Sequence, residues 1–543
     1  MAASAQLLEK NAVVAELRSV LLDIAPIHDT PIGVIHPYWA RKPMNVIETV
    51  INHLTLPGDL VVDPFMGSGT TVFGALQNGR RVVGSDISIL SQHLVSGLID
   101  LIENSELILP EIRRLLDEHR KITLPWYAFD DDNYVERLRF QVTGEFTDGA
   151  FCLEPTEIVT KVPKGLSWIG RRAHSDVLSL GRLPRVADNL GHMVAHPVDF
   201  ESLTLPENSR IAIPRGATLA QYFTEENRAS INVLVELIQK SPLSADHSAA
   251  LKLVLSASLP SLRLSDKKAS SQWPYWRPKT DLTSRNPIIV LEARYKQVVQ
   301  LVDWSQSTAL PSDFGQRHQI LAVAAQLLTS ESYEGQARLV LTDPPYGDQV
   351  PYLEYSAMWN GVLGLNVHDK VSSQELVRSN ASHRRSDSSD YLERLKSAFA
   401  ANASLLETGG FLAWFYQDQD LRCWEAIHDA AIEAGMVLLD VIPIPKQRRS
   451  LKTVTSPNAT LDGDLLCVFT TASGPSDTFR SREPQILDDG NESDGNHGSY
   501  FDRYAVLILS ALRSGNISKL ADQYGTVKRA LAAMGNSFVL AFG

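Results

Sequence analysis

The sequence predicts an α/β protein with a doubly wound sheet, a large inserted α+β lobe and a small helical C-terminal tail. Two apolar runs, Leu60–Val62 and Leu339–Thr342, each end at an aspartate followed by proline, as buried strands do where they stop. Segments of helical periodicity follow both runs, which indicates the alternation of a doubly wound sheet. Residues 101–317, between the two runs, have a mixed pattern of their own and predict the inserted lobe.

The composition is that of an ordinary globular chain of 543 residues, 44% hydrophobic and 21% charged. No stretch reaches the roughly 18 unbroken apolar residues of a membrane span, and no signal sequence is visible, so we expect a cytoplasmic protein without membrane contact. Cys152, Cys423 and Cys467 lack CxxC spacing, so we expect no metal site. The net charge of −12 opposes binding of a polyanion, so any nucleic-acid surface has to be local.

The N-terminal part begins with residues 1–30, where the pattern predicts an amphipathic helix from Ala5 to Leu22. The segment Ile35–Pro43 then combines aromatic, basic and proline residues and leads into helical periodicity over residues 46–54. This predicts a structured loop before a helix. By itself, a packing turn is the better explanation of this segment.

A glycine-rich turn follows the first predicted strand, in the segment Asp63–Thr71, and a helix begins after it. Glycines let a backbone approach a ligand, and the helix start directs N–H groups toward it. The glycines are not followed by lysine, which argues against a P-loop, and a third glycine in dinucleotide spacing is missing. Asp86 ends the next apolar run, where a carboxylate reaches ribose hydroxyls. The pattern therefore predicts a sugar-bearing cofactor without a phosphate tail.

The second aspartate run continues as Asp343-Pro344-Pro345-Tyr346. The prolines place an acid and two peptide units without N–H donors at the carboxyl end of a strand, where open parallel sheets bind ligands. An exocyclic amine of a nucleobase could donate one hydrogen to Asp343 and the other to the Pro344 carbonyl, while the base stacks on Tyr346. An ordinary Asp-Pro turn at a strand end is the alternative.

These segments resemble a known family. Residues 63–71 resemble the S-adenosylmethionine motif of amino-directed DNA methyltransferases, and residues 343–346 resemble their catalytic motif. Residues 36–43 look like the segment that wraps the methionine end of the cofactor in these enzymes. The longer run 342–355 is similar to a group of predicted adenine-specific DNA methylases, many of which carry a zinc ribbon.

The resemblance covers residues 31–100 and 318–473 and implies one split, Rossmann-like methyltransferase domain that uses S-adenosyl-L-methionine. It implies catalytic roles for Asp343, Pro344, Pro345 and Tyr346. It also implies cofactor contacts from His36, Lys42, Pro43, Asp63, Pro64, Phe65, Gly67, Ser68, Gly69, Thr70 and Asp86. Three departures are the missing zinc ribbon, the long segment from about residue 101 to 318 between the two motifs, and the alanines Ala324 and Ala325, which stand where these enzymes often place an acid near the adenine of the cofactor.

The inserted segment 101–317 predicts helix at 105–120, short strands over 135–215 and helix again over 216–262. Basic residues interleave with aromatic ones in two clusters of this segment, and a further basic loop follows residue 445. Basic residues bind phosphates and aromatic rings stack on bases, so the clusters are candidate nucleic-acid contacts. Solvated loops anchored by buried aromatic residues are an equally good explanation. The nucleic-acid contacts expected from these clusters are Arg171, Arg172, Lys267, Lys268, Trp276, Arg277, Arg448 and Arg449.

The C-terminal part continues with a helix over 391–405, stopped at 407–410, and a strand over 411–415. Two closing strands, over 437–442 and 465–469, are expected to pair antiparallel, and His383–Arg385 is another candidate phosphate contact. Residues 474–498 predict a flexible linker and residues 499–543 a helical tail, with three short helices over 505–512, 517–524 and 527–534. Oligomeric state leaves no signal in the sequence.

We therefore hypothesise that the protein transfers a methyl group from S-adenosylmethionine to an exocyclic amine of DNA, with N6 of adenine as the first candidate. Double-stranded DNA would be the partner, with the target base flipped out of the stack because the amine is not accessible inside it. The alternatives are cytosine N4 of DNA, the guanine 2-amino group of RNA, and a DNA-binding subunit whose methylase core is degenerate. The sequence does not separate restriction-modification, phage defence and housekeeping.

Overall fold

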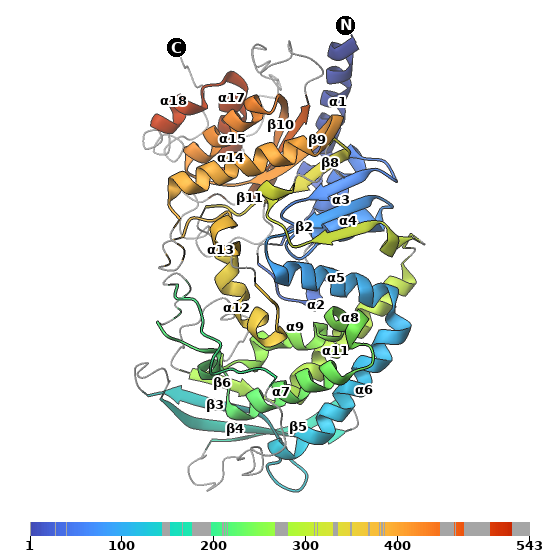
Figure 1. The fold of residues 1–543 in the computed structure, drawn as a ribbon, viewed down its shortest axis with the longest axis vertical. Coiled ribbons are helices and arrows are strands. Elements are labelled where there is room, and N and C mark those ends of the chain that lie inside the picture. Colours follow the sequence, from blue (N-terminus) through green and yellow to red (C-terminus); the bar gives the residue numbers. More distant parts are fainter. Residues whose placement is uncertain are drawn as a thin grey trace, which may run out of the picture.

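The computed structural model of the chain contains two β-sheets separated by helices (Figure 1). A seven-stranded sheet occupies one end of the molecule and a four-stranded sheet the other. The structure describes residues 2–27, 29–39, 41–143, 152–164, 167–175, 197–208, 211, 213, 215–265, 281–308, 310–311, 313–328, 335–347, 350–367, 370–379, 381, 384, 386–445, 461, 463–471 and 500–523.

The seven-stranded sheet has the order β10-β11-β9-β8-β1-β2-β7. Its strands are β1 (Leu60–Asp63), β2 (Arg81–Ser85), β7 (His318–Leu321), β8 (Ala337–Thr342), β9 (Leu406–Tyr416), β10 (Met436–Pro445) and β11 (Gly463–Thr471). From β7 to β9 all neighbours are parallel, whereas β11 is antiparallel to both β9 and β10. The predicted antiparallel pairing of the last two strands is confirmed. The sequence did not predict that β11 inserts between β9 and β10.

Helices cover both faces of this sheet, because successive strand residues point to opposite sides. Val61 packs with α1 (Ala2–Asp23), α3 (Met44–Leu54), α4 (Thr70–Gln77) and α5 (Ile89–Glu103) in one buried cluster. Val62 packs in a second cluster with α14 (Ser388–Ser404), α15 (Leu421–Glu433), α17 (Tyr500–Ser514) and α18 (Ile517–Asp522). A mixed α/β architecture with a mostly parallel central sheet is therefore confirmed.

One local prediction differs from the structure at Glu407–Gly410, which the pattern predicts as a helix stop. These residues lie inside β9, and α14 ends before them. Gly409 has a φ of 84°, so the strand bends there, and a Cβ at Gly410 would lie 2.9 Å from the Ala337 carbonyl oxygen. The two glycines thus permit a bent strand close to β8.

The second sheet has the order β5-β4-β3-β6 and is antiparallel. Its strands are β3 (Tyr134–Val142), β4 (Leu153–Lys164), β5 (Ser167–His174) and β6 (Asp281–Arg285). Helices of the intervening segments lie between it and the larger sheet (Figure 1): α6 (Ser105–Thr123), α7 (Glu225–Lys240), α8 (Ser244–Leu251), α9 (Leu253–Leu262) and α11 (Pro287–Ser307). The remaining helices are α2 (Pro31–Ile35), α12 (Tyr352–Leu363), α13 (Val371–Gln374) and the 3-10 turns Leu124–Tyr127, Leu219–Tyr222, Phe314–Gln316 and Ala325–Leu327.

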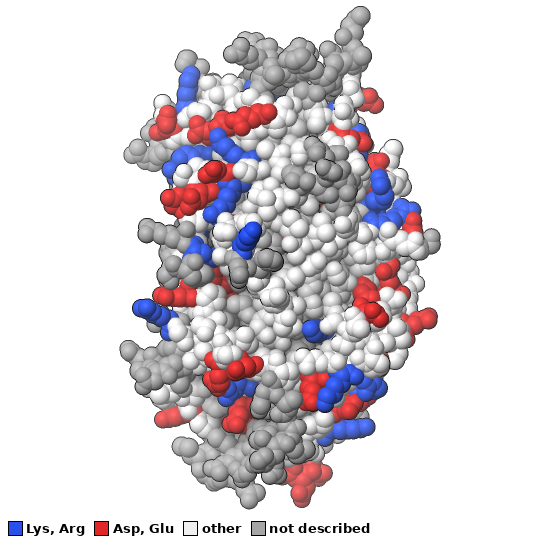
Figure 2. Space-filling model, in the orientation of Figure 1, with Lys and Arg blue, Asp and Glu red and all other residues white. Residues whose placement is uncertain are grey.

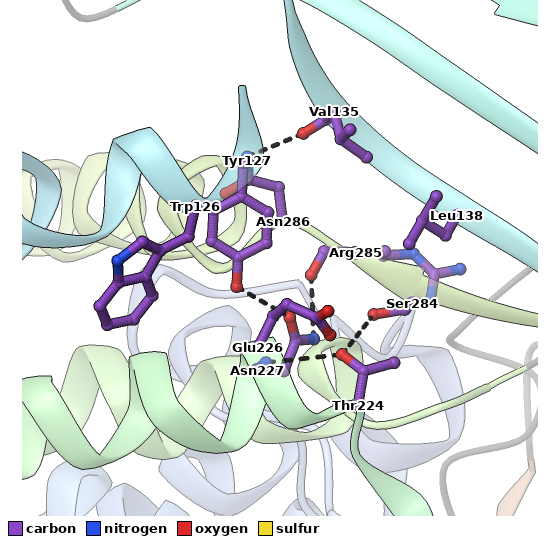
Figure 3. Close-up of a pocket in the computed structure, with 10 residues that line it drawn as sticks. All are labelled: Trp126, Tyr127, Val135, Leu138, Thr224, Glu226, Asn227, Ser284, Arg285 and Asn286. Carbon is purple, nitrogen blue, oxygen red and sulfur yellow. Dashed lines mark hydrogen bonds between the residues drawn. The ribbon is translucent and has the colours of Figure 1, made fainter. Parts of the chain in front are cut away.

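A small cavity with about 290 Å³ of empty space, its solvent-open part included, lies where the four-stranded sheet meets the helices (Figure 3). Its central group is the Asn227 amide, which donates to the carbonyl oxygens of Leu262 (2.8 Å) and Arg285 (3.1 Å) and accepts from the Tyr127 hydroxyl (3.1 Å). Asn286 donates to the Val135 carbonyl at 2.8 Å. These buried amides are hydrogen-bonded within the chain, so we interpret them as contacts that connect the four-stranded sheet to the helices.

No helix among the described residues is long and apolar enough to cross a membrane. The predicted linker 474–498 and the third predicted C-terminal helix, over 527–534, lie outside the described residues. The first two C-terminal helices are present as α17 and α18, which pack against α15 and β10 through apolar residues.

Candidate active site

The two predicted motif segments meet at the carboxyl ends of β1 and β8. These strands are parallel neighbours, with Val61 opposite Leu339, and the chain leaves β1 toward β2 on one side and returns as β8 on the other. At that junction the Thr342 hydroxyl donates a hydrogen bond of 2.9 Å to the Asp63 carboxylate. Strand order reverses at this point, which is where open α/β sheets bind ligands.

The glycine-rich turn after β1 is held in place by Asp86 after β2. Its carboxylate accepts the backbone N–H groups of Gly67 (2.9 Å) and Ser88 (2.8 Å). Gly69 has a φ of 84°, and a Cβ there would lie 2.7 Å from a Val95 methyl group, so only glycine fits. The Ser91 side chain also stabilises the ionised form of Asp86, and the four lone pairs of the carboxylate leave capacity for one more donor, such as a hydroxyl.

Both carboxyls at these strand ends are easier to protonate than usual. Burial raises the pKa of Asp63 to about 7, against the opposing hydrogen bonds from Thr71, Thr342 and the Phe65 N–H. Burial also raises the pKa of Asp86 to about 6, although backbone N–H groups stabilise its ionised form. The edge of the sheet therefore carries acids that change charge near neutral pH.

The segment 36–43 lies over the glycine-rich turn. Arg41 Nε donates to the Ser68 hydroxyl at 3.1 Å, and its other nitrogens donate to the carbonyls of Gly33 and His36. His36 itself is buried, with Nε2 2.8 Å from the Ser256 hydroxyl and Nδ1 2.8 Å from the Pro37 carbonyl. Burial lowers the pKa of His36 to about 3, so its ring is neutral and links this segment to α9.

Lys42 reaches the second motif. Its Nζ lies 2.9 Å from Asp343 Oδ2, 2.9 Å from the Tyr346 hydroxyl and 3.0 Å from Asp464 Oδ2. Burial lowers the pKa of Lys42, but the two carboxylates outweigh burial and hold it above its usual value. Burial raises the pKa of Asp343, and the charge of Asp464 adds to this rise while Lys42 opposes it. Burial, together with the charge of Asp464, therefore outweighs the shared cation and holds the pKa of Asp343 above its usual range.

A cavity connects these groups. It has about 470 Å³ of empty space, counting the part open to solvent, and its wall combines the glycine-rich turn, both strand ends and the segment 38–42. A neighbouring cavity shares Arg41, Lys42, Ser68 and Thr70 with it. The structure thus brings together most of the residues expected at the cofactor and catalytic sites: Lys42, Asp63, Phe65, Gly67, Ser68, Thr70 and Asp343 line the larger cavity. Pro43 caps α3 beside it, Gly69 is the N-cap of α4, and Pro64 lies between two lining residues.

Tyrosines from later elements hold the 343–346 segment in place, and no local pattern in the sequence indicated them. Tyr391, on α14, donates to the Pro345 carbonyl at 2.8 Å and accepts the Gly347 N–H at 3.0 Å. The Tyr416 hydroxyl, at the end of β9, lies 3.0 Å from that of Tyr391. Asp464 was missed as well, because only the strand order brings it near Asp343. The role of Thr342 was missed because only the pairing of β8 with β1 brings its hydroxyl to Asp63.

The residues expected to contact nucleic acid are only partly described. Arg171 is half exposed and pairs with Glu136 at 2.9 Å, Arg172 is exposed, and neighbouring Trp168 donates to Glu292. Figure 2 shows basic and acidic side chains interspersed on one face, with a largely uncharged middle. Arg384 is buried between Glu354 and Glu375, so the expected phosphate contact is not made by this residue. The other contacts expected there lie outside the described residues: Lys267, Lys268, Trp276, Arg277, Arg448 and Arg449.

Fold and site together define a class: α/β proteins that bind a small ligand at the switch point of a mostly parallel sheet. Comparison with known proteins narrows this class, because a family model described as DNA methylase matches residues 23–93. These residues contain the segment 36–43, the glycine-rich turn and Asp86. The resemblance to DNA methyltransferases is thus confirmed for this part of the chain.

Individual relatives also match only a short part of this chain. The type II methyltransferase M1.MboII of Moraxella bovis is 47% identical over 47 residues, 9% of this chain and 18% of that protein. The DNA adenine methyltransferase YhdJ of Escherichia coli (strain K12) is 38% identical over 63 residues, 12% of this chain and 20% of that protein. The chain therefore matches about a fifth of the length of these relatives. Asp343 lies outside the 23–93 match, so its role rests on geometry.

Proposed function

We propose that this protein transfers a methyl group from S-adenosylmethionine to an exocyclic amine of DNA, with adenine N6 as the target. One observation carries the proposal: the segment that matches DNA methylases contacts a distant Asp-Pro-Pro-Tyr segment. Thr342 donates to Asp63 at 2.9 Å, and Lys42 lies 2.9 Å from Asp343, about 300 residues away in sequence. Two motifs that imply a methyl donor and an amine acceptor thus share one cavity.

The residues present fit the cofactor. Asp86 and Asp63 would accept from its hydroxyl and amino groups, and the glycine-rich turn offers backbone close enough to contact it. Arg41 lines both cavities, and its hydrogen bonds to Ser68, Gly33 and His36 fix the guanidinium in place. Its remaining N–H groups would hold the cofactor carboxylate. When bound, S-adenosylmethionine supplies an electrophilic methyl group on a sulfonium.

The acceptor side follows from Asp343 and the prolines. An exocyclic amine is a poor nucleophile until its nitrogen becomes tetrahedral and gains positive charge. Asp343 and the Pro344 carbonyl would accept stronger hydrogen bonds from the amine in that state than in the ground state. Tyr346 would stack on the base. A hydrogen bond with a charged partner contributes about 1.5 to 3 kcal/mol, or one to two decades of rate.

DNA is the proposed polymer because the names of the relatives specify DNA adenine and type II methylation. Residues 31–100 and 318–473 would form the Rossmann-like methyltransferase unit, residues 101–317 the inserted lobe that recognises the target, and residues 499–543 a helical tail after the linker 474–498. The base would be flipped into the cavity, because its amine is not accessible in the stack. Arg171, Arg172, Lys267, Lys268, Trp276, Arg277, Arg448 and Arg449 are the proposed phosphate and base contacts of that surface.

The test incubates the protein with S-adenosylmethionine labelled in the methyl group and with plasmid DNA or total RNA, and then digests the polymer to nucleosides. The proposal predicts label in N6-methyl-2′-deoxyadenosine from DNA. Label in N4-methyl-2′-deoxycytidine would show that the target base is cytosine, and label in N2-methylguanosine would show that the substrate is RNA. Label in neither polymer would refute the activity and favour a DNA-binding subunit.

A further inference from the structure

The ammonium of Lys42 lies in a cage of two carboxylates and two aromatic rings. Asp343 and Asp464 contact Nζ at 2.9 and 3.0 Å, and the ring centres of Tyr346 and Phe415 lie 5.2 and 5.3 Å away. Nζ also donates to the Tyr346 hydroxyl at 2.9 Å, so Tyr346 contacts the ammonium through its oxygen. Carboxylates and an aromatic face such as that of Phe415 stabilise a cation. The residues come from four distant parts of the chain, so the fold builds a binding site for one positively charged nitrogen.

Both oxygens of Asp343 are engaged in this cage. The Tyr346 hydroxyl donates to Oδ1, and Lys42 donates to Oδ2. An acceptor amine has to share or displace one of these donors before Asp343 can accept its hydrogen. A buried ammonium that loses its only counterion pays a large desolvation cost, so Lys42 can leave Asp343 only if a second acid holds it.

Asp464 is that second acid. It stands near the start of β11, it is buried, and it reaches Lys42 because β11 inserts next to β9. The two carboxylates and one ammonium carry a net charge of −1, and this matches an amine that gains positive charge during transfer. Lys42, Asp343 and Phe415 line the cavity, so the cage opens toward the incoming base.

We propose that Asp464 is a positioning residue that retains Lys42 while the acceptor amine takes its place on Asp343, next to the rings of Tyr346 and Phe415. The inference rests on the proposed methyl transfer and extends it to a residue on the last strand. A purely structural salt bridge is the competing explanation, and the two differ in what happens when Lys42 is also removed.

The experiment measures single-turnover methyl transfer to DNA by four full-length proteins: wild type, Asp464→Asn, Lys42→Met and the double variant. In Asp464→Asn, of the two carboxylates described at Lys42 only Asp343 still contacts it, so the ammonium stays on Asp343 and competes with the acceptor amine. We therefore expect transfer to fall about 10- to 100-fold, the rate equivalent of one charge-assisted hydrogen bond. In the double variant no lysine ammonium occupies Asp343, so we expect transfer to be faster than in Asp464→Asn. A double variant no faster than Asp464→Asn, with the same melting temperature, would overturn the inference.

Asp440→Asn is the matched control. Asp440 lies on the neighbouring strand β10, is 12% exposed against 11% for Asp464, and pairs with Arg18 away from the cavity. We expect its transfer rate to stay within about twofold of wild type, because neither Asp440 nor Arg18 is among the described residues that line the cavity. An equal loss in Asp440→Asn would show that any lost strand acid slows the enzyme, and it would refute a special role of Asp464.

A second readout is independent of activity. Lysine side-chain NMR, with the Lys42 signal assigned by Lys42→Arg, reports the pKa of the ammonium. Removing the charge of Asp464 should lower the pKa of Lys42, whereas an unchanged value would refute the contact. Wild-type protein that labels no nucleic acid would refute the proposed function instead, so the two failures are distinguishable.

Discussion

Two of the ion triads among the described residues, those of Arg384 and Lys42, each place one cation between two carboxylates, but the first is sealed and the second opens to a cavity. In the sealed triad, Arg384 pairs with Glu354 and Glu375, with side-chain exposures of 2%, 0% and 3%. In the open triad, Lys42 pairs with Asp343 and Asp464, with exposures of 9%, 23% and 11%. Buried charge alone therefore does not mark a functional site.

The sealed triad has a structural explanation. Arg384 contacts Glu354 through Nε at 2.9 Å and through Nη2, in a bidentate arrangement, and Asn208 donates to the same carboxylate at 3.2 Å. Glu354 lies on α12, which follows the 343–346 segment, and Glu375 follows α13. This triad fixes the chain beyond the active site. The open triad uses a lysine, whose single flexible ammonium can exchange partners more easily than a bidentate arginine.

The largest effect on stability is expected from Arg384→Met. Two buried carboxylates would lose their cation, so the free energy of unfolding should fall by about 3 to 5 kcal/mol. Denaturant unfolding followed by circular dichroism measures this. Arg422→Met is the control, because its pair with Asp420 is exposed and contributes at most about 1 kcal/mol. A smaller loss of unfolding free energy in Arg384→Met than in Arg422→Met would contradict the stabilising role of the Arg384 triad.

Lys42→Met tests the open triad through pH. Without the ammonium, the pKa of Asp343 should rise further, because burial and Asp464 already raise it and Lys42 opposes them. Asp343 must be ionised to accept from the amine, so transfer by the variant should increase as pH rises through this higher pKa. The wild-type rate should level off at lower pH. Identical pH profiles of the single-turnover rate would contradict an interaction between Lys42 and Asp343.

Asp86→Asn addresses the cofactor side. Losing the charged acceptor should weaken S-adenosylmethionine about tenfold, the lower value for a charged hydrogen bond. The pKa of Asp86 is about 6, so wild-type affinity should increase as pH rises from 5 to 7.5 and the carboxylate ionises. Calorimetry measures both effects. Equal affinity of variant and wild type at high pH would exclude a role of Asp86 in cofactor binding.

The smallest effect is expected from Tyr391→Phe. It removes the donor to the Pro345 carbonyl and the acceptor for the Gly347 N–H, so the 343–346 segment should become less well positioned. A neutral hydrogen bond contributes about 1 kcal/mol, so kcat should fall about fivefold while cofactor affinity is unchanged. Tyr416→Phe, which leaves both backbone contacts of Tyr391 intact, should have less effect. The reverse order would assign the positioning role to Tyr416.

Much of the sheet was predictable, because its buried strands are apolar runs that end at recognisable aspartates. β1 and β8 follow from this pattern, and the antiparallel pairing of β10 with β11 follows from the polar loop that joins two apolar runs. The position of β11 beside β9 did not, since it depends on long-range pairing, and the bent start of β9 resembled a helix stop. Lys42 was expected at the cofactor and lines the cavity, but the sequence did not indicate that its ammonium also contacts Asp343, because only a side chain of this length reaches past the loop that carries it. Asp464 has no local motif at all.

The most direct measurement of the central claim compares wild type with Asp343→Ala, both incubated with labelled S-adenosylmethionine and DNA that is digested to nucleosides. Calorimetry on the same preparations measures cofactor binding. The proposed function predicts that the variant loses methyl transfer at least about 100-fold, since it loses a charged acceptor, and binds the cofactor nearly as well as wild type. Methyl transfer by Asp343→Ala at the wild-type rate would contradict the account.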